Sequence, residues 1–233
     1  MITAINENTE RKKFFLTMCS ISAAALLIFS INSQIAFAHQ RSLLNIGGKD
    51  YLFVIGSQNE PVFVDDKSGV DFFAYTPDPK DPMNSRANGT IPVENLEKTL
   101  KVEVSAGPKK KVFDFEPAFR DPGHYNAAFY PNVQTTYQYR LTGTINNTPI
   151  DLPFTCTTGP AEGQTGDNST VKISNGVERK AMAGGFGCPE SRSNVAFPEH
   201  YMSNVEIQDK LNQTASNTTS NSNTTRWHDN IVN

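Results

Sequence analysis

The sequence predicts an all-β protein: a single sandwich of about seven to eight short strands. Three observations support this prediction. Apolar and polar residues alternate in several short runs, turn residues separate these runs, and no stretch after the N-terminal segment has the period of an amphipathic helix. A barrel made from the same strands is the alternative.

The alternation is clearest in residues 121–145, DPGHYNAAFYPNVQTTYQYRLTGTI. A Pro-Gly turn precedes one alternating run, and a second run follows after a short connection. Tyr125 and Phe129 share a face of the first run, and Tyr137 and Tyr139 share a face of the second. We expect these runs to be the central pair of strands, with their tyrosines in the core.

The other expected strands flank this pair. They lie at residues 51–55, 62–64, 70–75, 100–105, 112–116 and 150–156, and residues 171–174 are a further candidate. Four prolines in residues 76–92 exclude a helix and predict an exposed loop. In the last main run Cys156 shares the inward face with Ile150, Leu152 and Phe154.

The first 38 residues have the layout of an export signal. Basic residues 11–13 precede a largely apolar run, and Ala-Phe-Ala at residues 36–38 has the small-x-small pattern of a cleavage site. The mature chain would then begin at His39. An uncleaved membrane anchor is the alternative, because residues 14–38 are long enough to span a bilayer. Both interpretations place the protein outside the cytoplasm, secreted into a periplasm-like space or held on the outer face of the cytoplasmic membrane.

Cysteine usage agrees with export. Cys19 lies within the signal, which leaves Cys156 and Cys188 as the cysteines of the mature chain. In an oxidising compartment they are expected to form one disulfide, with two unpaired buried thiols as the alternative. We therefore expect a sandwich at 39–160, an extension at 161–202 that the disulfide pins to it, and a disordered Asn/Ser/Thr-rich tail at 203–233.

Charge and glycosylation signals give further limits. The chain has 21 basic and 24 acidic residues and a net charge of −3, which argues against nucleic-acid binding. It also has several Asn-x-Ser/Thr sequons, of which Asn88 and Asn146 fall in expected loops or turns. These two asparagines are the expected glycosylation sites if the host glycosylates Asn.

The segments PGHYNAAFYP at residues 122–131 and TYQYRLTG at residues 136–143 resemble exported immunoglobulin-like modules of bacteria and archaea, including the copper-resistance CopC-like group. The resemblance covers about residues 51–156, and the chain looks most like uncharacterised members of that broad group. It implies a small extracytoplasmic immunoglobulin-like sandwich, in some cases a metal carrier or a module attached to membrane machinery.

His39 is the main candidate metal ligand. A mature chain that begins with His presents an α-amine and an imidazole that can chelate one copper ion, and CopC-like proteins use such an N-terminal His. A second imidazole would complete a three-nitrogen site suited to Cu(II). His124, beside the Pro-Gly turn, is the candidate, although no Met-rich run or His-x-His pair accompanies it. The alternative is that His39 is simply the first residue after cleavage and His124 a surface or capping side chain.

Other polar clusters have simpler explanations. Asp65, Asp66 and Asp71 resemble a sparse calcium cluster but lack EF-hand spacing, so a solvated hairpin turn is favoured. Residues 109–111 are three lysines that could touch an anionic surface or, more simply, protect a sheet edge. No nucleophile elbow, zinc-protease motif or phosphate-binding loop is present, so we expect no catalysis.

The sequence therefore predicts a non-catalytic exported module with a binding or structural role at the cell surface, where its partner would be a protein. The alternative is an extracytoplasmic copper-binding protein that uses His39. A secreted hydrolase would require a convergent acid/base pair. Any activity is expected at the ends of the sandwich, where His39, the loop at 76–92 and the Pro-Gly turn could meet.

Overall fold

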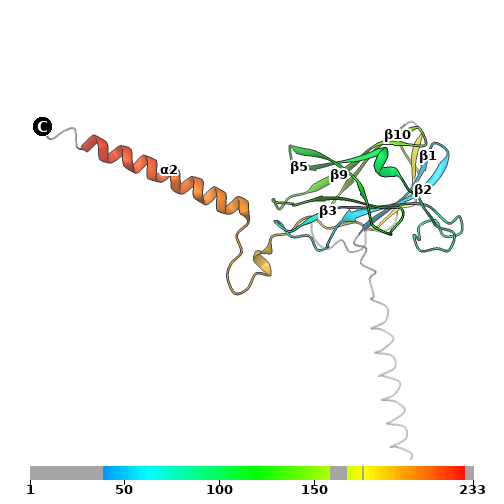
Figure 1. The fold of residues 1–233 in the computed structure, drawn as a ribbon, viewed down its shortest axis with the longest axis horizontal. Coiled ribbons are helices and arrows are strands. Elements are labelled where there is room, and N and C mark those ends of the chain that lie inside the picture. Colours follow the sequence, from blue (N-terminus) through cyan, green and yellow to red (C-terminus); the bar gives the residue numbers. More distant parts are fainter. Residues whose placement is uncertain (1–38, 158–166, 175, 229–233) are drawn as a thin grey trace, which may run out of the picture. The chain divides into compact units, whose positions relative to one another are not determined.

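The computed structural model describes residues 39–157, 167–174 and 176–228 of the 233-residue chain. The strands of this part of the chain form two antiparallel β-sheets that lie face to face (Figure 1). The predicted all-β sandwich is therefore confirmed, with two separate sheets rather than a closed barrel. The expected export signal or anchor at residues 1–38 lies outside the described residues.

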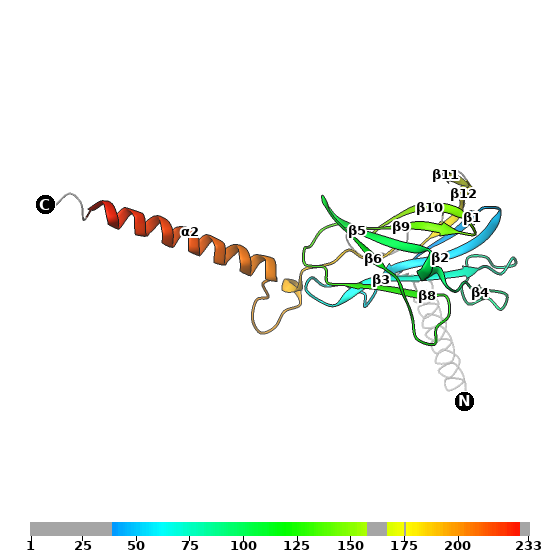
Figure 2. The same cartoon turned by 45° about the horizontal axis from the view of Figure 1, so that its top comes forward.

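The large sheet consists of β1 (His39–Ile46), β2 (Lys49–Ser57), β3 (Ser68–Thr76), β4 (Ile91–Pro92), β7 (Glu116–Pro117), β8 (His124–Phe129), β11 (Val171–Ser174) and β12 (Val177–Ala183). Their order is β11-β12-β1-β2-β3-β8-β7, with β4 paired to β3. The small sheet consists of β5 (Leu100–Ala106), β6 (Lys109–Asp114), β9 (Tyr137–Ile145) and β10 (Thr148–Thr155), in the order β10-β9-β5-β6. Figure 2 shows both layers from a second direction.

The core lies between the sheets because apolar side chains alternate with polar ones along most strands. Along β5, Leu100, Val102 and Val104 are buried, as the alternation predicted. Aromatic rings fill the centre, and Phe72 contacts Phe53 with ring centroids 5.0 Å apart. The largest fully buried side chains include Tyr51, Tyr125, Tyr139, Phe53, Phe72 and Phe186.

The two strands of residues 121–145 lie in different sheets. Strand β8 lies between β3 and β7 in the large sheet, and β9 lies between β10 and β5 in the small sheet. Tyr125, Tyr137 and Tyr139 are buried as expected, and Phe129 is partly buried, but the expected pairing of the two strands is wrong. Alternation identifies the inward face of a strand, and two strands that face each other across a core show the same pattern as two neighbours.

The boundaries of the sandwich also differ from the prediction. Strand β1, which the sequence analysis did not assign, pairs with β2 along its whole length. Strand β12 comes from the segment expected to be an extension, and it pairs with β1 inside the large sheet. Residues 62–64 form no strand; Phe63 makes only an isolated bridge to Glu190.

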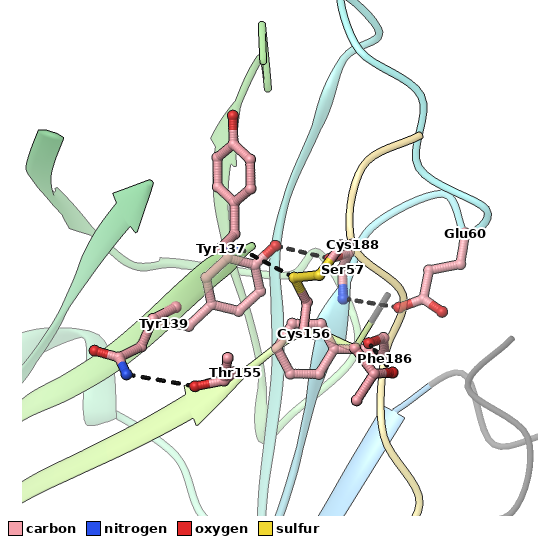
Figure 3. The surroundings of a disulfide bond; sticks show 10 residues. Ser57, Glu60, Tyr137, Tyr139, Thr155, Cys156, Phe186 and Cys188 are labelled. Atoms are coloured by element: carbon pink, nitrogen blue, oxygen red, sulfur yellow. Dashed lines mark hydrogen bonds between the residues drawn. A yellow bond between two sulfur atoms is a disulfide. The ribbon is translucent and has the colours of Figure 1, made fainter. Parts of the chain in front are cut away.

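The expected disulfide joins Cys156 to Cys188, whose Cα atoms are 4.9 Å apart. It fixes the segment that carries Phe186, whose fully buried ring stacks on Tyr139 with centroids 5.0 Å apart (Figure 3). The hydroxyls of Tyr139 and Ser57 lie 2.7 Å apart and share a hydrogen bond. The disulfide therefore links two segments of the chain and helps to hold Phe186 in the core.

A helix, α2 (Asn204–His228), occupies most of the region where the sequence predicted a disordered tail. Its first turn has a capping box: the main-chain N–H of Ser203 donates to Glu206 Oε2 at 2.7 Å, and the N–H of Glu206 donates to Ser203 Oγ at 3.3 Å. The Ser-x-x-Glu spacing was a local helix signal that the composition of the tail obscured. No helix in the described part of the chain is both long enough and apolar enough to span a membrane.

Candidate functional site

The two candidate histidines converge on one aspartate on the outer face of the large sheet. Strand pairing sets His39 on β1 opposite Gly56 on β2, and Gly56 opposite Asp71 on β3. Because Gly56 has no side chain, the imidazole of His39 can reach across β2 to Asp71. Strand β8 supplies His124 from the other side, opposite Phe73. We call His39, Asp71 and His124 the histidine–aspartate cluster.

Each oxygen of Asp71 meets one imidazole. His39 Nε2 lies 3.0 Å from Asp71 Oδ2, and His124 Nε2 lies 2.5 Å from Asp71 Oδ1. The other ring nitrogen of His124, Nδ1, lies 2.8 Å from Asp121 Oδ2. His124 thus has a carboxylate at both ring nitrogens, an arrangement that favours the doubly protonated imidazolium.

The electrostatics of the cluster follow from these contacts. Burial alone would raise the pKa of Asp71, but the hydrogen bonds from His124 and His39 outweigh burial and lower the pKa below its ordinary value. Burial alone would lower the pKa of His124, but the hydrogen bonds to Asp71 and Asp121 outweigh it and raise the pKa. The side chains of Asp71 and His124 are each only 17% exposed, so water screens these interactions weakly.

A third carboxyl group, Glu60, interacts electrostatically with His39 and Asp71. Burial raises its pKa to about 7, while the main-chain N–H of Ser57 and the charge of His39 act in the opposite direction. The N–H of Ser57 donates to Glu60 Oε1 at 3.2 Å, in the loop after β2 and beside the disulfide (Figure 3). Glu60 therefore carries a proton that it can release near neutral pH.

Aromatic rings fix the orientation of the imidazoles. Phe73 stacks on His124 with centroids 4.0 Å apart, and it forms an edge-to-face pair with His39, with centroids 6.0 Å apart. Tyr75, two residues further along β3, stacks on Phe73 at 6.4 Å. The rings shield one side of each imidazole from water and restrict its rotation.

Local sequence explains how β3 and β8 present these groups. On β3, Asp71 and Phe73 alternate with the core residues Val70 and Phe72, so they face outward. The Pro-Gly turn before His124 requires Gly123, which has a φ of 80° and whose Cβ, if present, would lie 2.9 Å from the carbonyl oxygen of Ala74. The glycine lets this turn pack onto β3 and position His124.

The donors of the cluster suit a borderline transition-metal ion. Two imidazoles and a carboxylate, with the α-amine of His39 if the chain is cleaved after Ala38, would make a nitrogen-rich set of the kind that Cu(II) prefers. In the arrangement described, however, the carboxylate lies between the two rings. Within the described residues, no group of three or more His, Cys, Asp or Glu side chains is placed so that it could hold a metal ion. A bound ion would therefore have to replace the protons that the rings share with Asp71.

Asp65 and Asp66, the other two aspartates of the sparse calcium pattern, and the remaining two histidines lie outside the cluster. Asp65 accepts hydrogen bonds from the Tyr201 hydroxyl and the Asn204 N–H, both at 2.9 Å, and Asp66 forms an ion pair with Arg192. The three aspartates of the sparse calcium pattern thus serve separate contacts. Along the chain, His200 falls in the segment that connects β12 to α2, and His228 is the last residue of α2.

The two expected glycosylation sites lie at the surface. Asn88 is exposed in the loop between β3 and β4, and Asn146 is exposed in the turn between β9 and β10. The side-chain amide of Asn146 donates to the hydroxyl of Tyr51 at 2.6 Å. A glycan on this nitrogen would have to be compatible with that contact.

Sequence reasoning did not identify Asp71 or Glu60 as members of the site. Asp71 was considered only with Asp65 and Asp66, as a sparse calcium cluster or, in preference, a solvated hairpin turn; alternation on β3 was the signal that it faces outward. Comparisons with protein-family models, curated proteins and solved structures found no match for the chain.

Proposed function

We propose that this protein is an exported, non-catalytic module of immunoglobulin-like type that binds copper at the histidine–aspartate cluster. One observation carries the proposal: His39 and His124, far apart in sequence, each place Nε2 on a different oxygen of Asp71. The resemblance of residues 122–143 to exported immunoglobulin-like modules supports the class of protein.

The chemistry of the cluster favours Cu(II) over Ca²⁺ or Mg²⁺. Imidazole nitrogens are poor ligands for the hard oxygen-seeking cations and good ligands for Cu(II). If the chain is cleaved after Ala38, the α-amine of His39 adds a nitrogen that chelates together with its imidazole. Asp71 then serves as an oxygen ligand or as the group that orients the two rings.

The same contacts support a binding role rather than catalysis. Both ring nitrogens of His124 face carboxylates, so neither faces a hydroxyl or thiol that it could activate. The Nε2 atom of His39 faces Asp71 in the same way. The cluster consists of imidazoles hydrogen-bonded to carboxylates, and it contains no hydroxyl or thiol nucleophile.

Mass spectrometry and copper titration test the proposal. Mass spectrometry should find His39 as the first residue of the exported protein, and this protein should bind one Cu(II) at micromolar concentration or below. His124→Ala should weaken binding by about 10- to 100-fold, as is usual when a ligand or its supporting group is lost. Blocking the α-amine of His39 should also weaken it.

His200→Ala is the matched control, because His200 lies outside the cluster. It should bind copper as the unmodified protein does. Exported protein that begins at His39 and takes up no Cu(II) would overturn the proposal, and so would equal losses in H124A and H200A.

A protein partner at the cell surface is the second candidate. It is favoured by Phe119, which is 85% exposed beside the cluster's Pro-Gly turn, with the guanidinium of Arg120 4.9 Å from its ring centroid. Exposed aromatic and arginine side chains are common at the centre of protein interfaces. The copper titration separates the two candidates, since a partner surface at Phe119 needs no metal.

A further inference from the structure

A pocket lies at the open edge of the sandwich, and none of its lining residues belongs to the histidine–aspartate cluster. Strand β6 is the last strand of the small sheet, and the pocket lies between β5 and β6 on one side and the end of β8 on the other. Its volume is about 410 Å³, within the range of small-molecule sites. Figure 2 labels the three strands that border it.

The floor of this pocket is apolar and aromatic. Phe129 contacts Phe113 with ring centroids 5.7 Å apart and stacks on Tyr137 at 6.0 Å. Phe113 and Phe129 are only partly buried, so their rings are open to the pocket. Val104 and Ala106 of β5 complete the floor. Such a surface suits the apolar body of a ligand, in particular an aromatic ring.

The rim of the pocket is cationic. Lys109, Lys110 and Lys111 line it, and its lining includes no aspartate or glutamate. Lys110 is paired with Glu103 at 3.1 Å. Lys111 lies over the ring of Phe113, 4.9 Å from the centroid, and the described residues provide no carboxylate partner for it or for Lys109. Two exposed cations therefore stand over an apolar floor in a protein whose net charge is −3.

We infer that this pocket binds a small amphiphilic organic anion. Its apolar or aromatic body would pack on Phe113, Phe129 and Tyr137, and its carboxylate, sulfonate or phosphate would face Lys109 and Lys111. The pocket shares no residue with the histidine–aspartate cluster. A failure of the copper proposal would therefore not affect this inference, and the reverse also holds.

Two fluorescent dyes that differ by one charged group test the inference. 8-Anilino-1-naphthalenesulfonate is an anion, and N-phenyl-1-naphthylamine has the same ring system without the sulfonate. The purified exported protein should bind the anionic dye saturably at one site, about fivefold more tightly than the neutral dye, as expected for two partly exposed charges. Equal affinities, or no saturable binding, would overturn the inference.

Variants locate the site. Lys109→Ala with Lys111→Ala should remove the preference for the anionic dye, whereas the charge-matched pair Lys67→Ala with Lys80→Ala should keep it. Ala106→Phe should fill the pocket and weaken both dyes, with far-UV circular dichroism confirming that the fold is kept. Unchanged binding in folded A106F, or equal losses in the two lysine pairs, would place the dye elsewhere and contradict the proposal.

Discussion

Asp71 is the residue on which the candidate site depends, because each of its two oxygens holds one imidazole. Because the pKa of Asp71 is lowered in the folded protein, its ionised carboxylate stabilises the fold at pH values above the ordinary aspartate pKa. This stabilisation is lost as the pH falls through the lowered pKa. The raised pKa of His124 acts in the opposite direction. The stabilisation of the fold by His124 is complete at pH values below the ordinary histidine pKa. It is lost as the pH rises through the raised pKa of His124. Asp71 and His124 together therefore stabilise the protein most at pH values between the ordinary pKa of aspartate and the ordinary pKa of histidine.

Asp71→Asn should lower the pKa of His124 toward its ordinary value, because only Asp121 would still favour the imidazolium. The NMR shift of the His124 ring protons against pH measures this change. Copper affinity should fall by about 10- to 100-fold in the same variant. Asp151→Asn, which removes the partner of Arg140 on the small sheet, should leave the His124 titration unchanged. The cluster would be refuted if both variants gave the same curve.

Glu60→Gln should reduce the loss of stability that occurs as the pH rises from the ordinary glutamate pKa through about 7. The raised pKa of Glu60, about 7, makes its contribution complete below the ordinary glutamate pKa and lost as pH rises through 7. Near pH 8.5 the variant should be more stable than the unmodified protein by about 1 kcal/mol, a discounted value because the carboxyl is partly exposed. Urea unfolding at pH 5 and pH 8.5 measures the difference. Glu116→Gln, on exposed β7, should follow the unmodified protein at both pH values.

At the scale of elements, β9 depends on a glycine that its alternating pattern does not reveal. Gly143 has a φ of 139°, and a Cβ built there would lie 2.0 Å from the carbonyl oxygen of Thr99. The Thr144 N–H donates to the same carbonyl oxygen at 3.2 Å, so Thr99 cannot move away without losing a hydrogen bond. The small sheet therefore needs a residue without a side chain at this point.

Gly143→Ala should destabilise the protein by about 3 kcal/mol or more, through a main-chain clash and an unfavourable φ. Gly107→Ala is the control. Gly107 has a φ of 56° with nothing within 4 Å of the added Cβ, so only the conformational cost of about 1 kcal/mol remains. Equal losses in urea unfolding would show that steric contact at Thr99 contributes nothing.

At the scale of the molecule, the disulfide joins Cys156, the residue after β10, to Cys188 in the segment that follows β12. It spans 32 residues of sequence and anchors Phe186, which is fully buried in the shared core. Because β12 also pairs with β1, the segment from β12 to Cys188 completes the sandwich that residues 39–157 begin.

Cys156→Ala with Cys188→Ala should reduce the free energy of unfolding by about 3 to 4 kcal/mol, from the added chain entropy of the unfolded state. Urea unfolding of the variant and of the reduced, unmodified protein should agree, since both lack the crosslink. A loss below about 1 kcal/mol would mean that contacts of Phe186 alone hold the segment in place.

The sequence by itself determined the properties that follow from local periodicity and residue chemistry. Alternation identified the inward residues of β5, β8, β9 and β10, and the expected export to an oxidising compartment predicted the pairing of two cysteines. The predicted cleavage before His39 and the resemblance to CopC-like proteins made His39 and His124 candidate ligands, which remains a prediction.

Only the tertiary structure decided which strands are neighbours. It placed β8 and β9 in different sheets, included β12 in the large sheet, and set Asp71 between the two histidines, on a sheet face rather than at the ends of the sandwich. Periodicity specifies the side of a strand, whereas pairing depends on contacts between residues distant in sequence. The reach of His39 across Gly56 is such a contact, so no local pattern contains it.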